Sequence, residues 1–337
     1  MMSQDLVQAP IPSPVVVTGA AGFIGRRLVT RLLEHGRRVR AFVRRDPPAD
    51  WPATPSLEVV TGDLADTTAV ERAVAGAAVV FHLGATMRGT AEDFDRGTIR
   101  GTQHVIDAVL RDGTANLVYV SSLSVLHAAA VGAGQVITES WPLEPMPEAR
   151  GQYTRSKLAA ERLVIDAVRT RGLRAIVVRP AEVVAAGAVF PSPGVAQRVG
   201  KILVVLGDGR VPVPLVAVDD LVDALVAASR GPFDGTVVHI VDPEPVTQND
   251  IVARYLAMQD GRGRVVHIPA RVVAFAASVA DLLFRAVGRQ APLTPYRVQS
   301  ALATRVFDGR KAAAVLDWQP RTGARRALDD AARSLAS

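Results

Sequence analysis

The fold of this chain is decided by the stretch Val15-Val16-Val17-Thr18-Gly19-Ala20-Ala21-Gly22-Phe23-Ile24-Gly25. Its first residues are β-branched and apolar, which is typical of a buried parallel strand. Apolar side chains then recur at helical spacing until Gly36, which predicts a helix. Glycine at every third position between them permits a tight turn and a close approach to a pyrophosphate at the helix N-terminus. The stretch therefore predicts a dinucleotide-binding loop, with cofactor contacts at Gly19, Ala21, Gly22, Phe23, Ile24 and Gly25.

A tyrosine and a lysine four residues apart, Tyr153 and Lys157, open a segment with helical periodicity. This spacing places both side chains on one face of a helix. A free phenol titrates near ~10, too high to exchange protons readily at neutral pH. A neighbouring ammonium group stabilises the phenolate and lowers the phenol pKa. The pair therefore predicts a phenol tuned for proton transfer.

The predicted strand at 117–121 ends in two serines, Ser121 and Ser122. Serine after a strand is commonly only a turn residue. Sheets that bind dinucleotides, however, place their chemistry at the carboxyl ends of their strands. The order of glycine loop, serine and tyrosine along the chain therefore favours a hydroxyl that binds a substrate carbonyl or alcohol oxygen beside the phenol.

With these elements the chain resembles the extended short-chain dehydrogenases/reductases, the NAD-dependent epimerase/dehydratase superfamily. The resemblance runs from about Pro14 to the C-terminal region, and its further motifs are Val178-Arg179-Pro180, Val218-Asp219-Asp220-Leu221 and Leu316-Asp317-Trp318-Gln319-Pro320. It implies that Tyr153 is the general acid/base and that Lys157 is its pKa partner and a ribose ligand. It also implies that Ser122, rather than Ser121, is the catalytic serine. The other cofactor contacts expected from it are Asp63, Leu64, Leu83, Gly84, Ala85, Pro180 and Val183.

The composition narrows the classes of protein. Of 337 residues, 49% are hydrophobic and 21% are charged, which favours a folded core over disorder. The formal charge of +6 comes from arginines scattered along the chain, so we expect no nucleic-acid interface. The absence of cysteine excludes disulfides and thiolate catalysis, and six scattered histidines predict no metal site. His82 lies in a strand pattern and is predicted to be a core residue.

Two segments bear on membranes and targeting. The first dozen residues contain prolines and no apolar core, so they do not predict a signal peptide, and we expect a cytoplasmic protein. The apolar stretch 272–284 contains Asp281 and is too short to span a bilayer. It predicts a helix over the substrate pocket, including Phe275. Surface association with a membrane is the alternative, because Arg271, Arg285 and Arg289 flank the stretch.

The order of elements predicts an α/β fold, a Rossmann-type doubly wound parallel sheet with a smaller, discontinuous C-terminal substrate domain. Strand-like runs at 15–18, 38–43, 57–60, 78–82, 117–121, 174–179 and 237–241 alternate mostly with helical patterns. We expect a dinucleotide-binding domain at 13–180 and 214–242, and a substrate-binding domain at 181–213 and 243–337. As in many relatives, helices near 92–110 and 153–169 are expected to form a homodimer interface.

The end of the second strand bears on the choice between NADP and NAD. An acidic residue usually reads the ribose 2′-hydroxyl there, but this chain has Arg44 and Arg45 before Asp46. A guanidinium pairs with a 2′-phosphate, whereas a carboxylate repels it. The sequence therefore favours NADP, with Arg44 as the main ligand. NAD stays open because Asp46 follows directly.

The expected substrate follows from two departures from the nucleotide-sugar enzymes of the superfamily. Those enzymes commonly carry an asparagine and an arginine near the substrate diphosphate, where this chain has Glu182 and Val213. The predicted pocket comprises Met87, Ser122, Trp141, Glu182, Phe190 and Val213, and its segments are mainly apolar. The chain is thus most similar to the branch of 3β-hydroxysteroid dehydrogenases and dihydroflavonol reductases. We expect hydride transfer between NADP(H) and an apolar carbonyl or alcohol substrate. The alternatives are a nucleotide-sugar epimerase/dehydratase and a non-catalytic NADP-binding sensor or assembly factor.

Overall fold

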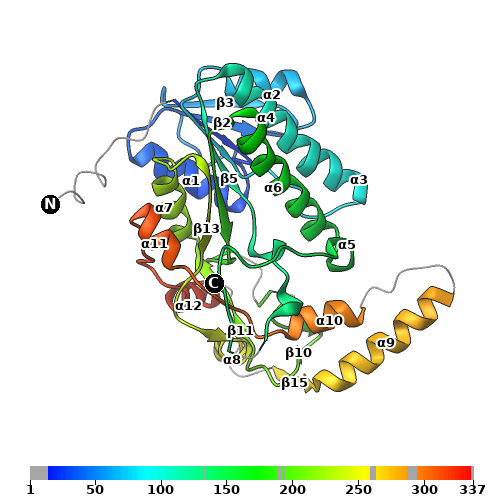
Figure 1. Ribbon diagram of the computed structural model, residues 1–337. Helices are drawn as coiled ribbons and strands as arrows, with labels where there is room; N and C mark the ends of the chain where they lie inside the picture. The colour runs from blue at the N-terminus through cyan, green and yellow to red at the C-terminus, as the bar shows by residue number, and fades with distance from the viewer. Residues whose placement is uncertain are drawn as a thin grey trace.

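The computed structural model describes residues 14–132, 134–187, 191–192, 194–258, 263–286 and 294–334. Its centre is a seven-stranded sheet in the order β13-β7-β5-β4-β1-β2-β3, in which every neighbouring pair is parallel (Figure 1). The strands are β1 (Val15–Thr18), β2 (Val39–Val43), β3 (Leu57–Thr61), β4 (Val79–His82), β5 (Asn116–Val120), β7 (Ala175–Pro180) and β13 (Asp234–Ile240). Each matches a strand predicted from the sequence. The strand order reverses at β1 and β4, so a crevice forms at the carboxyl ends of these strands.

Helices cover both faces of the sheet (Figure 1). One face carries α1 (Phe23–Glu34), α7 (Val218–Ala228) and α11 (Arg310–Leu316), and the other carries α2 (Thr67–Val74), α4 (Gly101–Asp112) and α6 (Gln152–Arg171). Successive strand residues point to opposite faces. Val15 and Val17 therefore join the core beneath α1 and α7, whereas Val16 joins the core beneath α2, α4 and α6. This arrangement confirms the predicted doubly wound architecture.

Helix α1 forms as its sequence pattern predicts. Leu28, Val29 and Leu32 are buried on its inner face. The helix ends at its cap residue His35, and Gly36 follows with φ +68°, a left-handed conformation that suits glycine. Helix α6 ends in the same way, at Gly172 with φ +72°. These helix ends return the chain to β2 and β7, which border the crevice.

Short elements connect the main layers. Helix α3 (Ala91–Phe94) and the π-helical turn Asp95–Arg100 lead into α4, and two 3₁₀ turns, Leu123–Val125 and Ala128–Ala130, follow β5. Helix α5 (Pro147–Arg150) immediately precedes α6. These connections bring the segment after β5 and the start of α6 to the same end of the sheet.

A smaller part of the molecule lies beyond the carboxyl ends of the strands (Figure 1). It contains β8 (Glu182–Val184) paired with β12 (Leu215–Ala217), the sheet β15-β10-β9, the pair β11 (Pro212–Val213) and β14 (Val246–Thr247), and the pair β6 (Val136–Ile137) and β16 (Val306–Phe307). The strands of its three-stranded sheet are β9 (Gln197–Val199), β10 (Ile202–Leu206) and β15 (Arg264–Ile268), and its helices are α8 (Gln248–Met258), α9 (Ala270–Ala286), α10 (Pro295–Leu302) and α12 (Ala324–Arg333). A separate core that includes Val205, Leu215 and Leu328 supports this part.

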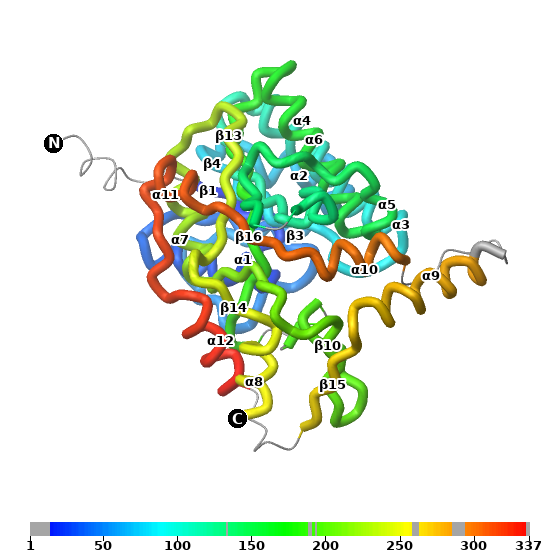
Figure 2. The backbone as a smooth tube through the Cα atoms, turned by 60° about the horizontal axis from the view of Figure 1, so that its bottom comes forward, coloured from blue at the N-terminus to red at the C-terminus, as the bar shows by residue number. Residues whose placement is uncertain are grey.

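Helix α9 corrects one expectation. The sequence predicts a helix that covers the substrate pocket, but Phe275 and Leu282 of α9 are 72% and 70% exposed. The buried side of the helix, Val273 and Ala277, packs instead against Val298 of α10. Figure 2 shows α9 extending away from the rest of the molecule. None of the helices in the described ranges is both long enough and apolar enough to cross a membrane.

The C-terminal segment returns to the central sheet. Trp318 Nε1 donates a hydrogen bond to the backbone oxygen of Asp220 at 3.0 Å. The Asp220 carboxylate, itself 1% exposed, accepts bonds from the backbone N–H groups of Arg321, Thr322 and Gly323 at 2.8–2.9 Å. The first α7 turn therefore anchors the end of the chain, and α11 packs with α7 in the core of that face.

Candidate active site

The loop between β1 and α1 has the geometry that a pyrophosphate requires. Gly19 adopts φ +67°, and a Cβ atom there would lie 2.9 Å from the backbone nitrogen of Gly84. A Cβ atom at Gly25 would lie 2.2 Å from the carbonyl oxygen of Gly19. Helix α1 begins after Gly22 with no side-chain cap and no acidic residue in its first turn. Its first N–H groups and positive dipole end therefore suit a phosphate anion, so these residues fit a dinucleotide.

A single cavity of about 960 Å³ runs along this loop and past the carboxyl ends of the strands. It is lined by every residue predicted to bind the cofactor: Gly19, Ala21, Gly22, Phe23, Ile24, Gly25, Arg44, Arg45, Asp63, Leu64, Leu83, Gly84, Ala85, Tyr153, Lys157, Pro180 and Val183. Ser122, Met87, Glu182 and Val213 line the same cavity. The fold thus brings the predicted cofactor and catalytic residues together, and the volume accommodates a dinucleotide with a small substrate.

Three side chains converge where β5 ends and α6 begins. Tyr153 lies in the first turn of α6, and Lys157 lies one turn later. Lys157 Nζ donates a hydrogen bond to the carbonyl oxygen of Val120, the last residue of β5, at 2.6 Å. Ser122 follows that strand, and its hydroxyl lies close enough to the Tyr153 phenol to lower the phenol pKa. The arrangement holds a phenol, a hydroxyl and an ammonium group at one point of the cavity.

The pKa of Tyr153 differs from the one predicted from the sequence. The sequence predicts a lowered pKa for Tyr153, but burial raises the pKa of this phenol, and the hydrogen bond with Ser122 offsets only part of the rise. Burial also lowers the pKa of Lys157 to about 8, although the Glu161 carboxylate acts in the opposite direction. The reason is that desolvation disfavours the charged form of each group. A lysine with a pKa near 8 is still mostly protonated at neutral pH.

A buried polar network lies next to Ser122, Tyr153 and Lys157. Glu161 accepts hydrogen bonds from Arg179 Nε at 3.0 Å and from Arg179 Nη2 at 2.6 Å, and both side chains are at most 5% exposed. The Ser121 hydroxyl donates to the same carboxylate at 2.5 Å. Because Ser121 is engaged in this way, the geometry favours Ser122 as the serine that meets a substrate. Sequence reasoning missed Glu161, although its position four residues after Lys157 places both on one helical face.

His82 is a core residue, as its strand pattern predicts. It is 1% exposed, and its ring nitrogens lie 2.7 Å from Thr18 Oγ1 and 3.0 Å from Thr102 Oγ1. Burial, with a smaller contribution from the charge of Lys157, lowers the pKa of His82 to about 3. The imidazole is therefore neutral at physiological pH and connects β1, β4 and α4 beneath the glycine loop.

The substrate half of the cavity differs in part from the expected pocket. Trp141 does not line it: its Nε1 donates to the carbonyl oxygen of His127 at 3.1 Å, and its ring packs on the core of the α1 face. Phe275 is exposed on α9, and Phe190 lies outside the described residues. The assignments of Trp141 and Phe275 were wrong because apolar character alone does not separate pocket residues from core or surface residues.

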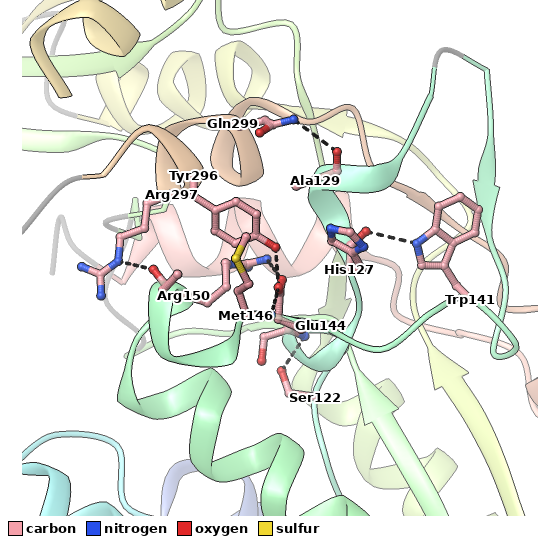
Figure 3. A network of polar contacts seen from close by, with 12 residues as sticks. Ser122, His127, Ala129, Trp141, Glu144, Met146, Arg150, Tyr296, Arg297 and Gln299 are labelled. Carbon is pink, nitrogen blue, oxygen red and sulfur yellow. Dashed lines mark hydrogen bonds and ion pairs between the residues drawn. The ribbon is translucent and has the colours of Figure 1, made fainter. Parts of the chain in front are cut away.

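Polar residues that the sequence analysis missed line this half instead, namely Arg150, Gln248 and Arg305. Figure 3 shows Arg150 beside Glu144, a fully buried carboxylate that accepts hydrogen bonds from Arg150 at 3.3 Å and from the hydroxyl of Tyr296. The backbone N–H of Met146 donates to Glu144 at 3.0 Å. No local pattern identifies these residues, because they are single positions in separate segments of the chain.

Comparison with known proteins identifies the family of the chain. The NAD dependent epimerase/dehydratase family matches residues 15–241. A 4-hydroxy-2-methyl-3-oxo-4-farnesyl-3,4-dihydroquinoline-1-oxide ketoreductase of Stigmatella aurantiaca is 30% identical over 321 residues, which cover 93% of this chain and 94% of that protein. A 3-beta-hydroxysteroid dehydrogenase of Mycolicibacterium neoaurum is 29% identical over 277 residues, 75% of this chain and 74% of that protein.

A solved structure of MoeE5 in complex with UDP-glucose and NAD is also similar. It superposes with a TM-score of 0.71 at 26% identity and covers 96% of this chain and 98% of its own. The family match includes the whole central sheet and the glycine loop, and this loop lines the cavity. The chain therefore belongs to the NAD dependent epimerase/dehydratase family of extended short-chain dehydrogenases/reductases, and it is a nicotinamide-dependent oxidoreductase of that superfamily.

Proposed function

We propose that this protein transfers a hydride between NADP(H) and the carbonyl or alcohol group of an apolar substrate of steroid, flavonoid or aryl type. The observation that carries the proposal is the convergence of Ser122, Tyr153 and Lys157 in the cavity that the glycine loop also lines. Proton donor, orienting hydroxyl and cation thus stand beside the predicted cofactor position.

The chain's own residues have separate roles in this reaction. When bound, the nicotinamide supplies or accepts the hydride. Tyr153 gives a proton to the carbonyl oxygen during reduction and takes it back during oxidation. Ser122 donates a hydrogen bond to the same oxygen and stabilises the charge that develops there. Lys157, held by the carbonyl of Val120, contributes a positive charge and a ribose contact.

The lining of the cavity supports the apolar substrate class. Glu182 and Val213 line it at the positions where nucleotide-sugar enzymes commonly carry diphosphate ligands. A carboxylate at Glu182 would repel a diphosphate. The named relatives include a steroid dehydrogenase and a ketoreductase of a quinoline oxide that carries a farnesyl chain, so each printed name contains a large apolar group. The alternative, a nucleotide-sugar epimerase or dehydratase, is supported by the likeness to MoeE5, whose structure contains UDP-glucose.

A thermal-shift screen on the cofactor-loaded protein tests the substrate class. A steroid ketone, a flavanone and an aryl ketone should raise the melting temperature, whereas UDP-glucose and dTDP-glucose should raise it little, because only ligands of the native state stabilise it. Consumption of NADPH with the stabilising ketone distinguishes an enzyme from a non-catalytic sensor. Stabilisation by a nucleotide sugar alone, converted without net NADPH consumption, would support the epimerase alternative instead.

Arg44 is proposed as the main contact for the 2′-phosphate of NADP. Arg44, Arg45 and Asp46 are exposed and line the cavity after β2. Arg44→Ala should raise the Kd for NADPH about 10- to 100-fold, since a charge-assisted hydrogen bond is lost. The Kd for NADH serves as the internal control and should hardly change. Tighter binding of NADH than of NADPH by the wild type, with no effect of the substitution, would refute the assignment.

The quaternary arrangement and the domain division stay proposals. Helices α4 and α6 pack side by side on one face of the sheet, as a four-helix homodimer interface requires. We propose that the outer faces of these two helices pair two subunits.

We also propose that segments 181–213 and 243–337 form the substrate half of the site, since Glu182, Val213, Gln248 and Arg305 of these segments line the cavity.

A further inference from the structure

Two arginines that belong to none of the sequence motifs, Arg150 and Arg305, line the substrate half of the cavity. Arg150 ends α5, and Arg305 precedes β16. Arg150, Glu182 and Arg305 line the same cavity, and the charges of the first two act on that of Arg305. A guanidinium stays protonated at physiological pH. The charge left for a ligand to neutralise therefore depends on which of the two arginines already forms an ion pair with a carboxylate of the protein.

Arg150 has its partner within the protein. Its Nη1 lies 3.3 Å from the Glu144 carboxylate, which is fully buried and also accepts the Tyr296 hydroxyl and the Met146 N–H (Figure 3). All three groups donate hydrogen bonds to the carboxylate of Glu144. The negative charge of Glu144 therefore balances the positive charge of Arg150 in the protein without a ligand.

Arg305 has no such partner among the described residues. Its Nε is buried and makes no hydrogen bond, and no carboxylate in the described ranges forms an ion pair with it. Burial, with a smaller contribution from the charge of Arg150, lowers the pKa of Arg305 to about 10, although the Glu182 carboxylate acts in the opposite direction. Arg305 nevertheless stays charged at neutral pH. Glu182 is the carboxylate of the described residues that acts on the charge of Arg305, and burial raises the pKa of Glu182 although Arg305 acts in the opposite direction.

A partly buried charge that makes no ion pair is costly, so its presence in a ligand cavity points to a counter-charge that the ligand supplies. The planar guanidinium matches the two oxygens of a carboxylate. One unpaired positive charge balances one negative charge, whereas a diphosphate brings two towards Glu182. We propose that Arg305 binds an oxyanion of the substrate, and that the apolar ketone or alcohol of the proposed function, on which this inference rests, carries one carboxylate.

A matched pair of probes tests the site. The protein saturated with NADP⁺ is titrated in a calorimeter with 4-acetylbenzoate and with its uncharged methyl ester. The acid should bind at least about 10-fold more tightly than the ester, which is the effect of one charge-assisted pair. Arg305→Met should abolish this preference. The control, Arg210→Met, should retain it, because Arg210 is 86% exposed in its side chain and does not line the cavity. Absence of any preference in the wild type, including failure of both probes to bind, overturns the inference.

A second measurement does not depend on the choice of probe. Arg305→Met should raise the melting temperature of the protein without substrate, because a methionine of similar length removes the desolvation cost of an unpaired charge. A structural arginine would give the opposite result. A lower melting temperature for Arg305→Met than for Arg210→Met therefore overturns the assignment.

The outcomes also separate this inference from the proposed function. Reduction of the ketone group of the methyl ester to the alcohol by NADPH, with no preference for the acid, overturns the oxyanion site and leaves the proposed function intact. Arg305-dependent binding of UDP-glucose, with no binding of 4-acetylbenzoate, overturns both the carboxylate and the apolar substrate class. Tight binding of the acid without turnover in either direction supports the site and contradicts the proposed reaction.

Discussion

Tyr153→Phe should lower kcat by about 10²- to 10⁴-fold, the usual contribution of one general acid/base group. Phenylalanine keeps the ring in the first turn of α6 and removes only the hydroxyl group beside Ser122. The substitution removes a neutral group, so it leaves no buried charge without a counter-charge. NADPH binding should therefore stay close to that of the wild type. The comparison requires steady-state turnover with a ketone identified in the thermal-shift screen and a fluorescence titration with NADPH.

Two results would contradict this role for Tyr153. Turnover like that of the wild type would exclude the phenol as the proton donor. A parallel loss of NADPH affinity and turnover would show that the substitution disturbs the cofactor site rather than the chemical step. Ser122→Ala is the companion variant, because it removes the other group that meets the substrate oxygen but leaves the phenol in place. It should lower kcat without shifting the cofactor Kd.

Glu161→Gln should lower the free energy of unfolding by about 3–5 kcal/mol, because it leaves Arg179 as a buried cation without a counter-charge. In the native protein the Glu161 carboxylate accepts two hydrogen bonds from Arg179 and one from Ser121. The substitution preserves the size of the side chain and removes its charge. Urea unfolding followed by circular dichroism gives the change in stability.

The matched control is Asp166→Asn on the same helix. Asp166 pairs with Arg169, but the two side chains are 59% and 73% exposed. An exposed pair of this kind contributes less than about 1 kcal/mol, so the control variant should unfold nearly like the wild type. An equal, small effect of both substitutions would mean that the buried network does not depend on the charge of Glu161.

Glu161→Gln should also change the pH dependence of turnover. The Glu161 carboxylate raises the pKa of Lys157, which burial lowers to about 8. Without that carboxylate the ammonium group loses its proton at a lower pH. Activity that depends on the charged lysine should then decline from a lower pH than in the wild type, whereas Asp166→Asn should leave the profile unchanged. An unaltered alkaline limb would separate Lys157 from the rate-limiting protonation state.

Much of the architecture was predictable from local patterns in the sequence. The seven strands of the central sheet appear where apolar, β-branched runs predicted them, and α1 ends just before the predicted Gly36. The reason is that strand and helix periods leave a direct trace in the order of residues. The positions of Tyr153 and Lys157 on one turn of α6 follow from the same local geometry. The glycine loop was predictable because only glycine tolerates the close backbone approaches found at Gly19 and Gly25.

The sequence by itself thus determined the sheet, the cofactor loop and the spacing of the catalytic pair. The tertiary structure alone decided three other properties: the raised pKa of Tyr153, the exclusion of Trp141 and Phe275 from the cavity, and the meeting of Arg305 with Glu182 and Arg150. Desolvation depends on every element packed around a group, and apolar side chains serve core, pocket and surface alike. Contacts between residues more than one hundred positions apart leave no period in the chain, so only the folded arrangement brings their charges together.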